Sequence, residues 1–136
     1  LLVSNLLAIH QKKYIGKLSA FCGAVSAGYA CGAAITYMLG GNFNQIANTI
    51  INTLANTSGI ICDGAKPSCA AKISSALDAA LLAHTMSMHD DVFHADEGIV
   101  KDDLEKTIRA VGYIGREGMK STDIEVLNIM IDKVCP

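Results

Sequence analysis

The sequence lacks tryptophan, and aromatic residues make up only 5% of its 136 residues. A core built around large rings is therefore excluded, and small side chains with closely packed backbones must form it instead. Charged residues are also few, at 18%, whereas hydrophobic residues reach 51%. This composition excludes an intrinsically disordered chain and predicts a single domain over residues 1–136 with a substantial core.

The sequence has no excess of positive charge, because its formal net charge is −2 at neutral pH. Binding to nucleic acid or to an anionic membrane surface needs a basic excess, so neither is an expected partner. The N-terminus shows no secretory signal, since its lysines follow the first apolar run instead of preceding it. We therefore expect a cytoplasmic protein. The apolar start at Leu1 leads us to expect a fragment of a longer chain.

Charge is absent from the 45 residues between Lys17 and Asp63. A transmembrane segment over residues 18–39 has to be considered, since such an uncharged run is long enough to span a bilayer. However, small residues dominate this run, and the next segment, residues 42–57, carries six asparagines and glutamines. A helix buried inside a protein without a membrane span is the better interpretation.

Apolar residues recur at helical spacing along most of the chain, and no alternating strand pattern is sustained. Residues 20–39 are apolar on all sides, with small residues at three- and four-residue steps that allow close helix packing. The expected fold class is all-α, a compact bundle of about six helices around this buried Ala/Gly-rich helix. The first three expected helices cover residues 1–13, residues 20–39, and a segment that is capped by Asn42 and ends before residue 56. The fourth runs from Pro67 to about His84, and the fifth runs from about Asp102 to the glycines at 112–118. The last covers residues 123–133 and is capped by Ser121 or Thr122.

Five cysteines without a secretory signal argue against a disulfide framework. Cys22 and Cys31 are most simply small core residues, as free cysteines often are. Cys62 and Cys69 differ, because they flank a loop with glycine and proline at the start of a helix, where function is more common than core packing. Their spacing is unusual for zinc, and thiolates on such a frame could equally hold an iron–sulfur cluster, so the residues alone leave the metal open.

The same loop has a second property. Free N–H groups follow Pro67 at the start of the helix, and Lys66 lies beside them, which together form a natural site for a carboxylate. Lys66 and Ser68 are therefore candidate substrate-binding residues. The alternative is a solvated turn with a charged tip.

Three segments resemble a known family. They are KLSAFCGA at residues 17–24, NTSGIICDGAKPSC at residues 56–69, and residues 122–131. Together they resemble the C-terminal, alpha-type part of the iron–sulfur L-serine dehydratase superfamily, with the L-cysteine desulfidase branch as the closest match. The resemblance extends over essentially the whole chain, and residues 59–69 are its most specific part.

This resemblance implies a [4Fe-4S] cluster held by the thiolates of Cys22, Cys62 and Cys69. Three thiolates leave one iron open, and that iron can act as a Lewis acid on the leaving group of an amino acid. The implied reaction is β-elimination of L-serine or L-cysteine to pyruvate and ammonia, with sulfide released from cysteine.

The catalytic base is not identified by the resemblance. Full-length members of the family have a large N-terminal portion, or a separate subunit, that supplies part of the active site, and nothing in these residues corresponds to it. The four histidines lie outside the matching motif and are more simply surface or capping residues: His10, His84, His89 and His94. We therefore expect a C-terminal cluster-binding part that is inactive alone and needs the missing portion or a partner subunit.

Two further expectations concern the surface and the chain end. Residues 20–56 hold more apolar and amide surface than a lone domain covers, so we expect a homodimer or contact with the missing portion. Cys135, the penultimate residue, is a candidate fourth ligand that could occupy the open iron until substrate displaces it, and the alternative is an incidental terminal cysteine. The alternative function for the chain is a non-catalytic helical interaction or regulatory domain.

Overall fold

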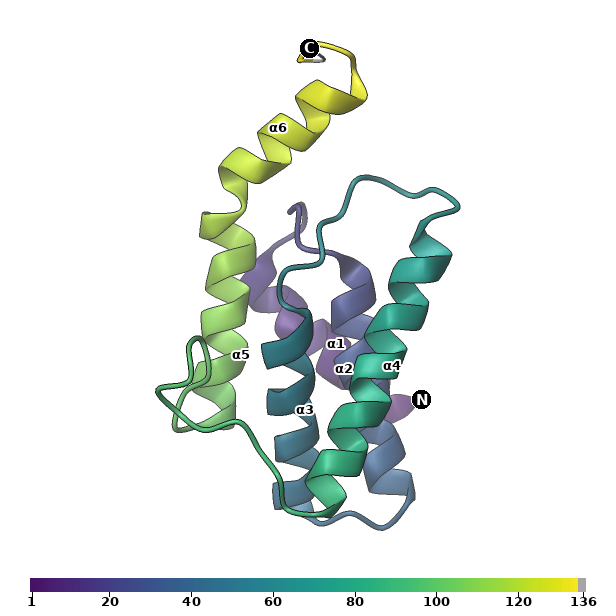
Figure 1. The fold of residues 1–136 in the computed structure, drawn as a ribbon, viewed down its shortest axis with the longest axis vertical. Coiled ribbons are helices and arrows are strands. Elements are labelled where there is room, and N and C mark those ends of the chain that lie inside the picture. Colours follow the sequence, from purple (N-terminus) through teal and green to yellow (C-terminus); the bar gives the residue numbers. More distant parts are fainter. Residues whose placement is uncertain (135–136) are drawn as a thin grey trace.

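The computed structural model describes residues 1–134, and within this range the secondary structure is helical apart from turns, loops and one isolated β-bridge. The all-α prediction is thus confirmed. Figure 1 shows the first five helices packed together, while the last one extends beyond the end of the bundle. The helices are α1 (Leu2–Ile15), α2 (Gly23–Met38), α3 (Phe43–Thr57), α4 (Cys69–Met88), α5 (Leu104–Tyr113), the π-helix η1 (Ile114–Gly118) and α6 (Lys120–Met130).

Helices α2 and α4 pack in parallel at very short distance. A Cβ atom placed on Gly28 would lie 2.8 Å from the backbone oxygen of Ala76, and one placed on Gly32 would lie 2.9 Å from the Cβ of Ala80. The contacts advance by one turn on both helices, so the two helices run in the same direction with a fixed register. Both helices therefore begin at the same end of the bundle, as Figure 1 shows.

Helix α2 is not buried on all sides, contrary to the sequence-based expectation. One face carries exposed Ala27 and Cys31, and its last turn exposes Tyr37 and Met38. The prediction that Cys31 is a core residue is therefore wrong, whereas Cys22 is buried. The reason is that α1, α3 and α4 contact only part of the circumference of α2.

The segment around residues 112–118 also differs from the expectation. Its glycines do not end a helix, because α5 continues through η1 into α6. Gly112 is needed for packing, since a Cβ atom there would overlap the Cβ of Tyr14 on α1. Helix α6 begins at Lys120 without a side-chain cap, so neither Ser121 nor Thr122 caps it.

Asparagines determine the placement of α3. Asn42 caps the helix, with Gln45 completing a reciprocal capping box, as predicted for Asn42. Asn52 is buried, donates to the backbone oxygen of Asp91 at 2.9 Å and accepts from the backbone N–H of Phe93 at 3.0 Å. These bonds hold the loop after α4 against α3.

Within residues 1–134, none of the helices combines the length and the apolar character needed to cross a bilayer.

Candidate functional site

A short β-bridge joins the segment before α2 to the segment after α3. Phe21 pairs with Ile61 in antiparallel fashion, the N–H of Cys22 donates to the oxygen of Ile60 at 3.0 Å, and the N–H of Cys62 donates to the oxygen of Ala20 at 2.6 Å. Cys22 and Cys62 are thus diagonal neighbours across the bridge, a position at which Cα atoms are typically about 7–8 Å apart. Both contact the same hydrophobic core cluster. The bridge therefore brings together two thiols that are 40 residues apart in the sequence.

The parallel register of α2 and α4 brings the third thiol to the same place. Gly28 lies against Ala76, so one turn earlier residue 24 lies level with residue 72, and Cys69 comes level with the segment that contains Cys22. Cys22 is the N-cap residue of α2, and Cys69 is the first residue of α4. The Cys69 thiol donates to the backbone oxygen of Gly64 at 3.4 Å. All three cysteines therefore lie at one end of the bundle.

Lys72, one turn after Cys69 on α4, reaches into this region. Its ammonium group donates to the backbone oxygen of Ile61 at 2.8 Å and to the carboxylate of Asp63. Lys66 pairs with the other carboxylate oxygen of Asp63 at 2.9 Å. The hydrogen bond from Lys72, followed by that from Lys66, lowers the pKa of Asp63 to about 2.

Lys72 was not found by sequence reasoning, although its position three residues after Cys69 was a usable signal. Residues at this spacing share a helix face. Its hydrogen bond to Asp63 raises the pKa of Lys72, with smaller contributions from the charges of Cys22 and Cys69.

The two residues predicted to bind a substrate carboxylate lie on the loop between the thiols. Lys66 is held by Asp63, and Ser68 is exposed and makes no side-chain capping bond. The N–H groups of Cys69 and Ala70 already donate to the oxygens of Lys66 and Pro67, at 2.9 and 3.1 Å. A carboxylate at this helix start would therefore compete with these turn bonds for two of the N–H groups.

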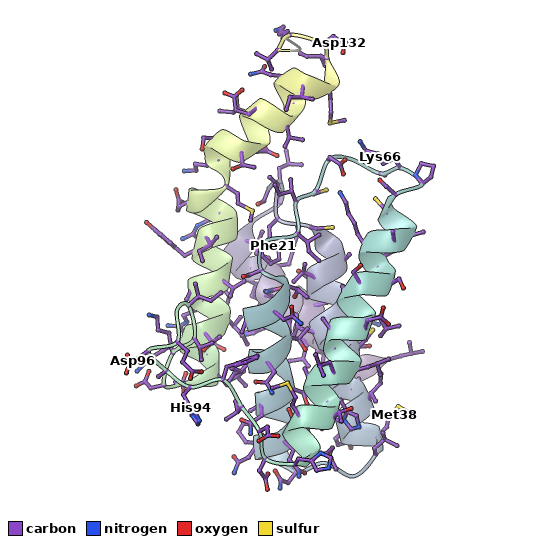
Figure 2. The ribbon with its side chains drawn as sticks, in the orientation of Figure 1. Phe21, Met38, Lys66, His94, Asp96 and Asp132 are labelled. Atoms are coloured by element: carbon purple, nitrogen blue, oxygen red, sulfur yellow. The ribbon has the colours of Figure 1, made fainter. Side chains whose placement is uncertain are left out.

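Helix α6 borders the site from above. A cavity of about 230 Å³ lies between this helix and the loop, and Cys62 is the thiol that lines it. Leu127 and Met130 of α6 form part of its wall, and the Met130 side chain lies 3.2 Å from the position that a Cβ on Gly64 would take. Figure 2 shows Lys66 above Phe21, on the side of the bundle toward α6, whereas Met38 lies toward the opposite end.

The thiol donor set can be tested for its fit to an iron–sulfur cluster. Among residues 1–134, no group of three or more His, Cys, Asp or Glu side chains has the geometry to hold a single metal ion. A multi-iron cluster separates its thiolates more widely than one ion does, and three thiols at one end of the bundle fit that chemistry. Cys135 lies outside the described residues.

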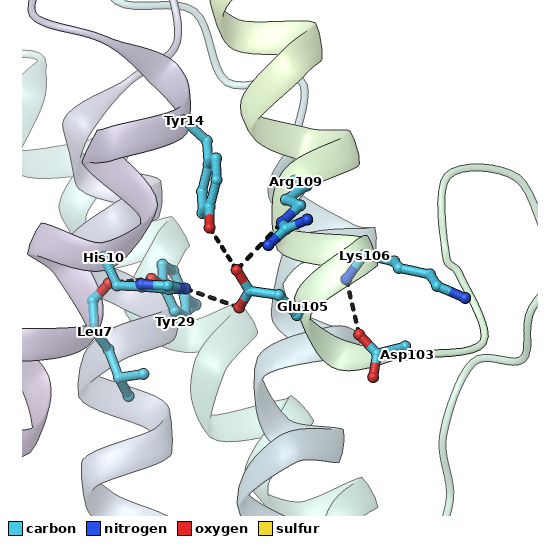
Figure 3. Close-up of polar contacts among 8 residues, drawn as sticks. All are labelled: Leu7, His10, Tyr14, Tyr29, Asp103, Glu105, Lys106 and Arg109. Carbon is cyan, nitrogen blue, oxygen red and sulfur yellow. Dashed lines mark hydrogen bonds and ion pairs between the residues drawn. The ribbon is translucent and has the colours of Figure 1, made fainter.

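The histidines have structural contacts elsewhere. His10 lies 2.8 Å from the carboxylate of Glu105, which also accepts from the hydroxyl of Tyr14 at 2.5 Å and from Arg109 at 3.4 Å (Figure 3). The Tyr14 hydrogen bond makes the largest contribution to lowering the pKa of Glu105. These bonds join α1 to α5.

The remaining histidines show similar roles. His84 bonds the hydroxyl of Thr36 at 2.9 Å, and His89 bonds the oxygen of Thr85 at 2.8 Å. His84 lies 15 residues after Cys69 on the same helix, a separation of about 22 Å at 1.5 Å per residue. His94 lies in the loop after α4, where its N–H donates to Glu97 at 2.7 Å.

Comparison with known proteins decides the family. The family model described as "Serine dehydratase alpha chain" matches residues 1–128, nearly the whole chain. The chain belongs to the serine dehydratase alpha chain family. The resemblance to the serine dehydratase alpha chain is therefore confirmed, and residues 17–24 and 56–69 both lie within the matched part.

The curated relatives that this chain matches are much longer. A UPF0597 protein from Treponema denticola is 60% identical over 131 residues, which is 96% of this chain and 30% of that relative. Similar proteins from Finegoldia magna and Lachnoclostridium phytofermentans are 54% and 57% identical, each over 32% of the relative. No solved structure matches this chain. The chain thus spans about 30% of the length of the curated relatives it matches.

Proposed function

We propose that this chain supplies the cluster-binding part of an iron–sulfur-dependent amino-acid lyase that acts on L-serine or L-cysteine. The observation that carries the proposal is the backbone bridge that sets Cys22 beside Cys62 at the end of the bundle where Cys69 begins α4. Membership in the serine dehydratase alpha chain family supports a part in lyase chemistry.

In this proposal Cys22, Cys62 and Cys69 hold a [4Fe-4S] cluster. When bound, the cluster supplies an iron with an open coordination position, which acts as a Lewis acid toward the leaving hydroxyl or thiol of the substrate. The backbone bonds of the bridge fix Cys22 and Cys62, whereas the Cys69 thiol must turn away from the Gly64 oxygen to become a ligand.

Lys66 and Ser68 are proposed to bind the carboxylate of the amino-acid substrate. The Lys66 side chain is partly exposed, so its ammonium group can pair with a substrate carboxylate from the solvent side while Lys72 remains bonded to Asp63. The catalytic base is assigned to a part of the protein beyond these residues. This agrees with the length of the relatives, about 70% of which this chain does not match.

The proposed protein is cytoplasmic and works as a homodimer, or with a partner subunit or further portion that completes the active site. Exposed apolar side chains support such a contact. Ile73, Leu77 and Leu81 follow one another at four-residue steps on α4, with exposed fractions of 56%, 38% and 41%. Ile73 and Leu77 lie beside the small residues of α2 around Cys31. Light scattering on the purified protein checks the mass expected for a dimer.

The test uses the complete protein, reconstituted without oxygen from ferrous iron and sulfide. The expected result is the visible absorption of a cluster, about four irons per chain as a [4Fe-4S] centre requires, and release of pyruvate from L-serine or of pyruvate and sulfide from L-cysteine. Replacing Cys22, Cys62 or Cys69 by serine should each reduce the iron content. Cys31→Ser is the matched control, because Cys31 is exposed on α2 and contributes nothing to the bridge. Full iron content in all three ligand variants would refute the assignment.

Cys135 is proposed as a displaceable fourth ligand. The Cys135 thiolate would shield the open iron from oxygen and would have to leave before substrate binds. Cys135→Ser is therefore expected to shorten the lifetime of the cluster in air and to remove a lag before steady-state turnover. Unchanged values for both measurements would eliminate this ligand.

The second candidate function, a non-catalytic interaction domain, is favoured by the apolar stripe of Ile73, Leu77 and Leu81. In that case the complete protein would take up no iron and release no pyruvate, and substitutions in the stripe would change only its association.

A further inference from the structure

Lys72 has a position that the proposed function does not use. Its side chain is 24% exposed, less than that of Lys66 at 40%, although both pair with Asp63. The covered part is the aliphatic stem, and a long lysine side chain keeps its ammonium group in one place only where that group has partners. The partners of Lys72 are the Asp63 carboxylate and the Ile61 backbone oxygen.

These partners place the ammonium group close to the segments that carry the cysteines of the site. Ile61 directly precedes Cys62, and it pairs with Phe21, which directly precedes Cys22. Cys69 lies three residues before Lys72, on the same face of α4. One ammonium group is thus anchored between the three segments that carry the thiols. The contributions of Cys22 and Cys69 to the raised pKa of Lys72 agree with this placement.

The charge balance of the site gives Lys72 a role. The thiolate ligands and the carboxylates of Asp63 and Asp123 would gather negative charge at one end of the bundle, where both carboxylates line the cavity beneath α6. The net charge of its surroundings and the hydrogen bonds made around it set the reduction potential of a cluster. Outer groups of this kind also control how tightly a metal centre is retained.

Resting on the proposed function, we infer that Lys72 is a positioning residue that acts as the counter-charge of the thiolate site. It holds the segment around Ile61 and Asp63 against α4, and its positive charge stabilises the cluster-bound thiolates. Lys72 does not touch the substrate in this assignment. Its role is therefore separable from that of the substrate-binding residues.

The experiment compares variants of the complete protein after anaerobic reconstitution. The variant Lys72→Met keeps the length of the side chain and removes its charge, whereas Lys72→Arg keeps the charge. Lys106→Met is the matched control, because Lys106 is an exposed lysine on α5 that likewise pairs with a carboxylate, that of Asp102 at 2.9 Å. The two readouts are the rate of iron loss to a chelator and the reduction potential of the cluster, followed by the bleaching of its visible absorption.

We expect Lys72→Met to lose iron about tenfold faster than the wild type, a typical effect of removing an outer-shell partner. Its reduction potential should fall, because a positive charge near the cluster favours the more negative reduced state. Lys72→Arg should stay close to the wild type on both readouts, and Lys106→Met should not differ from it.

Asp63→Asn separates the charge of Lys72 from its mechanical role. Removing the carboxylate takes away a negative charge and weakens the loop contact, so a counter-charge role predicts a raised potential in this variant and a lowered one in Lys72→Met. If the reduction potential shifts in the same direction in both variants, Lys72 only holds the loop in place, and the counter-charge assignment is overturned. Circular dichroism confirms that each variant is folded.

Two failures are distinguishable. If Lys72→Met matches Lys106→Met in iron retention and potential, the inference on Lys72 is refuted while the cluster proposal stands. If the wild-type protein itself takes up no iron, the proposed function is refuted and the role of Lys72 is refuted with it.

Discussion

The close contact between α2 and α4 gives a quantitative prediction for the substitution Gly32→Ala. A Cβ atom on Gly32 would lie 2.9 Å from the Cβ of Ala80 and 3.2 Å from its backbone oxygen. Carbon atoms pack best at about 3.5–4.0 Å, so the two helices would have to separate by about 0.5–1 Å. Neither neighbouring atom can move away on a flexible side chain, because both belong to a buried alanine on a regular helix.

The expected loss of stability follows from two opposing effects. Overpacking in a tight core costs about 1–3 kcal/mol. Replacing glycine by alanine inside a helix returns up to about 1 kcal/mol. The free energy of unfolding should therefore fall by about 1–2 kcal/mol. With a denaturant dependence of about 2 kcal/mol per molar urea, the midpoint of urea unfolding should fall by about 0.5–1 M.

Equilibrium unfolding in urea, followed by far-ultraviolet circular dichroism, checks this value. Gly23→Ala is the matched control, because the added Cβ at the start of α2 has nothing within 4 Å. Its stability should equal or slightly exceed that of the wild type. The double variant Gly32→Ala with Ala80→Gly moves the methyl group from α4 to α2, so it should recover most of the packing loss. A Gly32→Ala variant as stable as the wild type would refute the close packing of the two helices.

Three other substitutions test the polar contacts. Glu105→Gln should lower the free energy of unfolding by about 1 kcal/mol at neutral pH, because exposed charged hydrogen bonds contribute modestly. Since the pKa of Glu105 is lowered in the fold, this difference in stability is full above the ordinary glutamate pKa and should vanish as the pH falls through the lowered value. Unfolding at a series of pH values checks this dependence. Asn52→Ala should cost about 1–3 kcal/mol and speed hydrogen exchange in the loop after α4, while exposed Asn44→Ala should change neither. Asn42→Ala removes the capping box of α3 and should lower the melting temperature through a loss of about 1 kcal/mol.

Much of the candidate site could be predicted from the sequence because its signals are local. The loop at residues 62–69 is predicted by its glycine, proline and two cysteines, which lie between two helical patterns. Cys22 could be associated with that loop through its family motif, whereas its distance of 40 residues gave no physical reason for proximity. The role of Lys72 could not be predicted, because its contacts with Ile61 and Asp63 exist only after the loop folds back on α4.

The sequence by itself determined the helical class, because periodic apolar residues, the Asn42 cap and small residues at helical spacing act within one or two turns of the chain. Only the tertiary structure decided which faces are covered. It left Cys31 exposed on α2, and it used Gly112 for close packing on Tyr14 instead of ending the helix there. It also joined Cys22 to Cys62 through the bridge between Phe21 and Ile61. Burial and long-range pairing depend on where whole helices lie relative to one another, and local spacing carries no information about that arrangement.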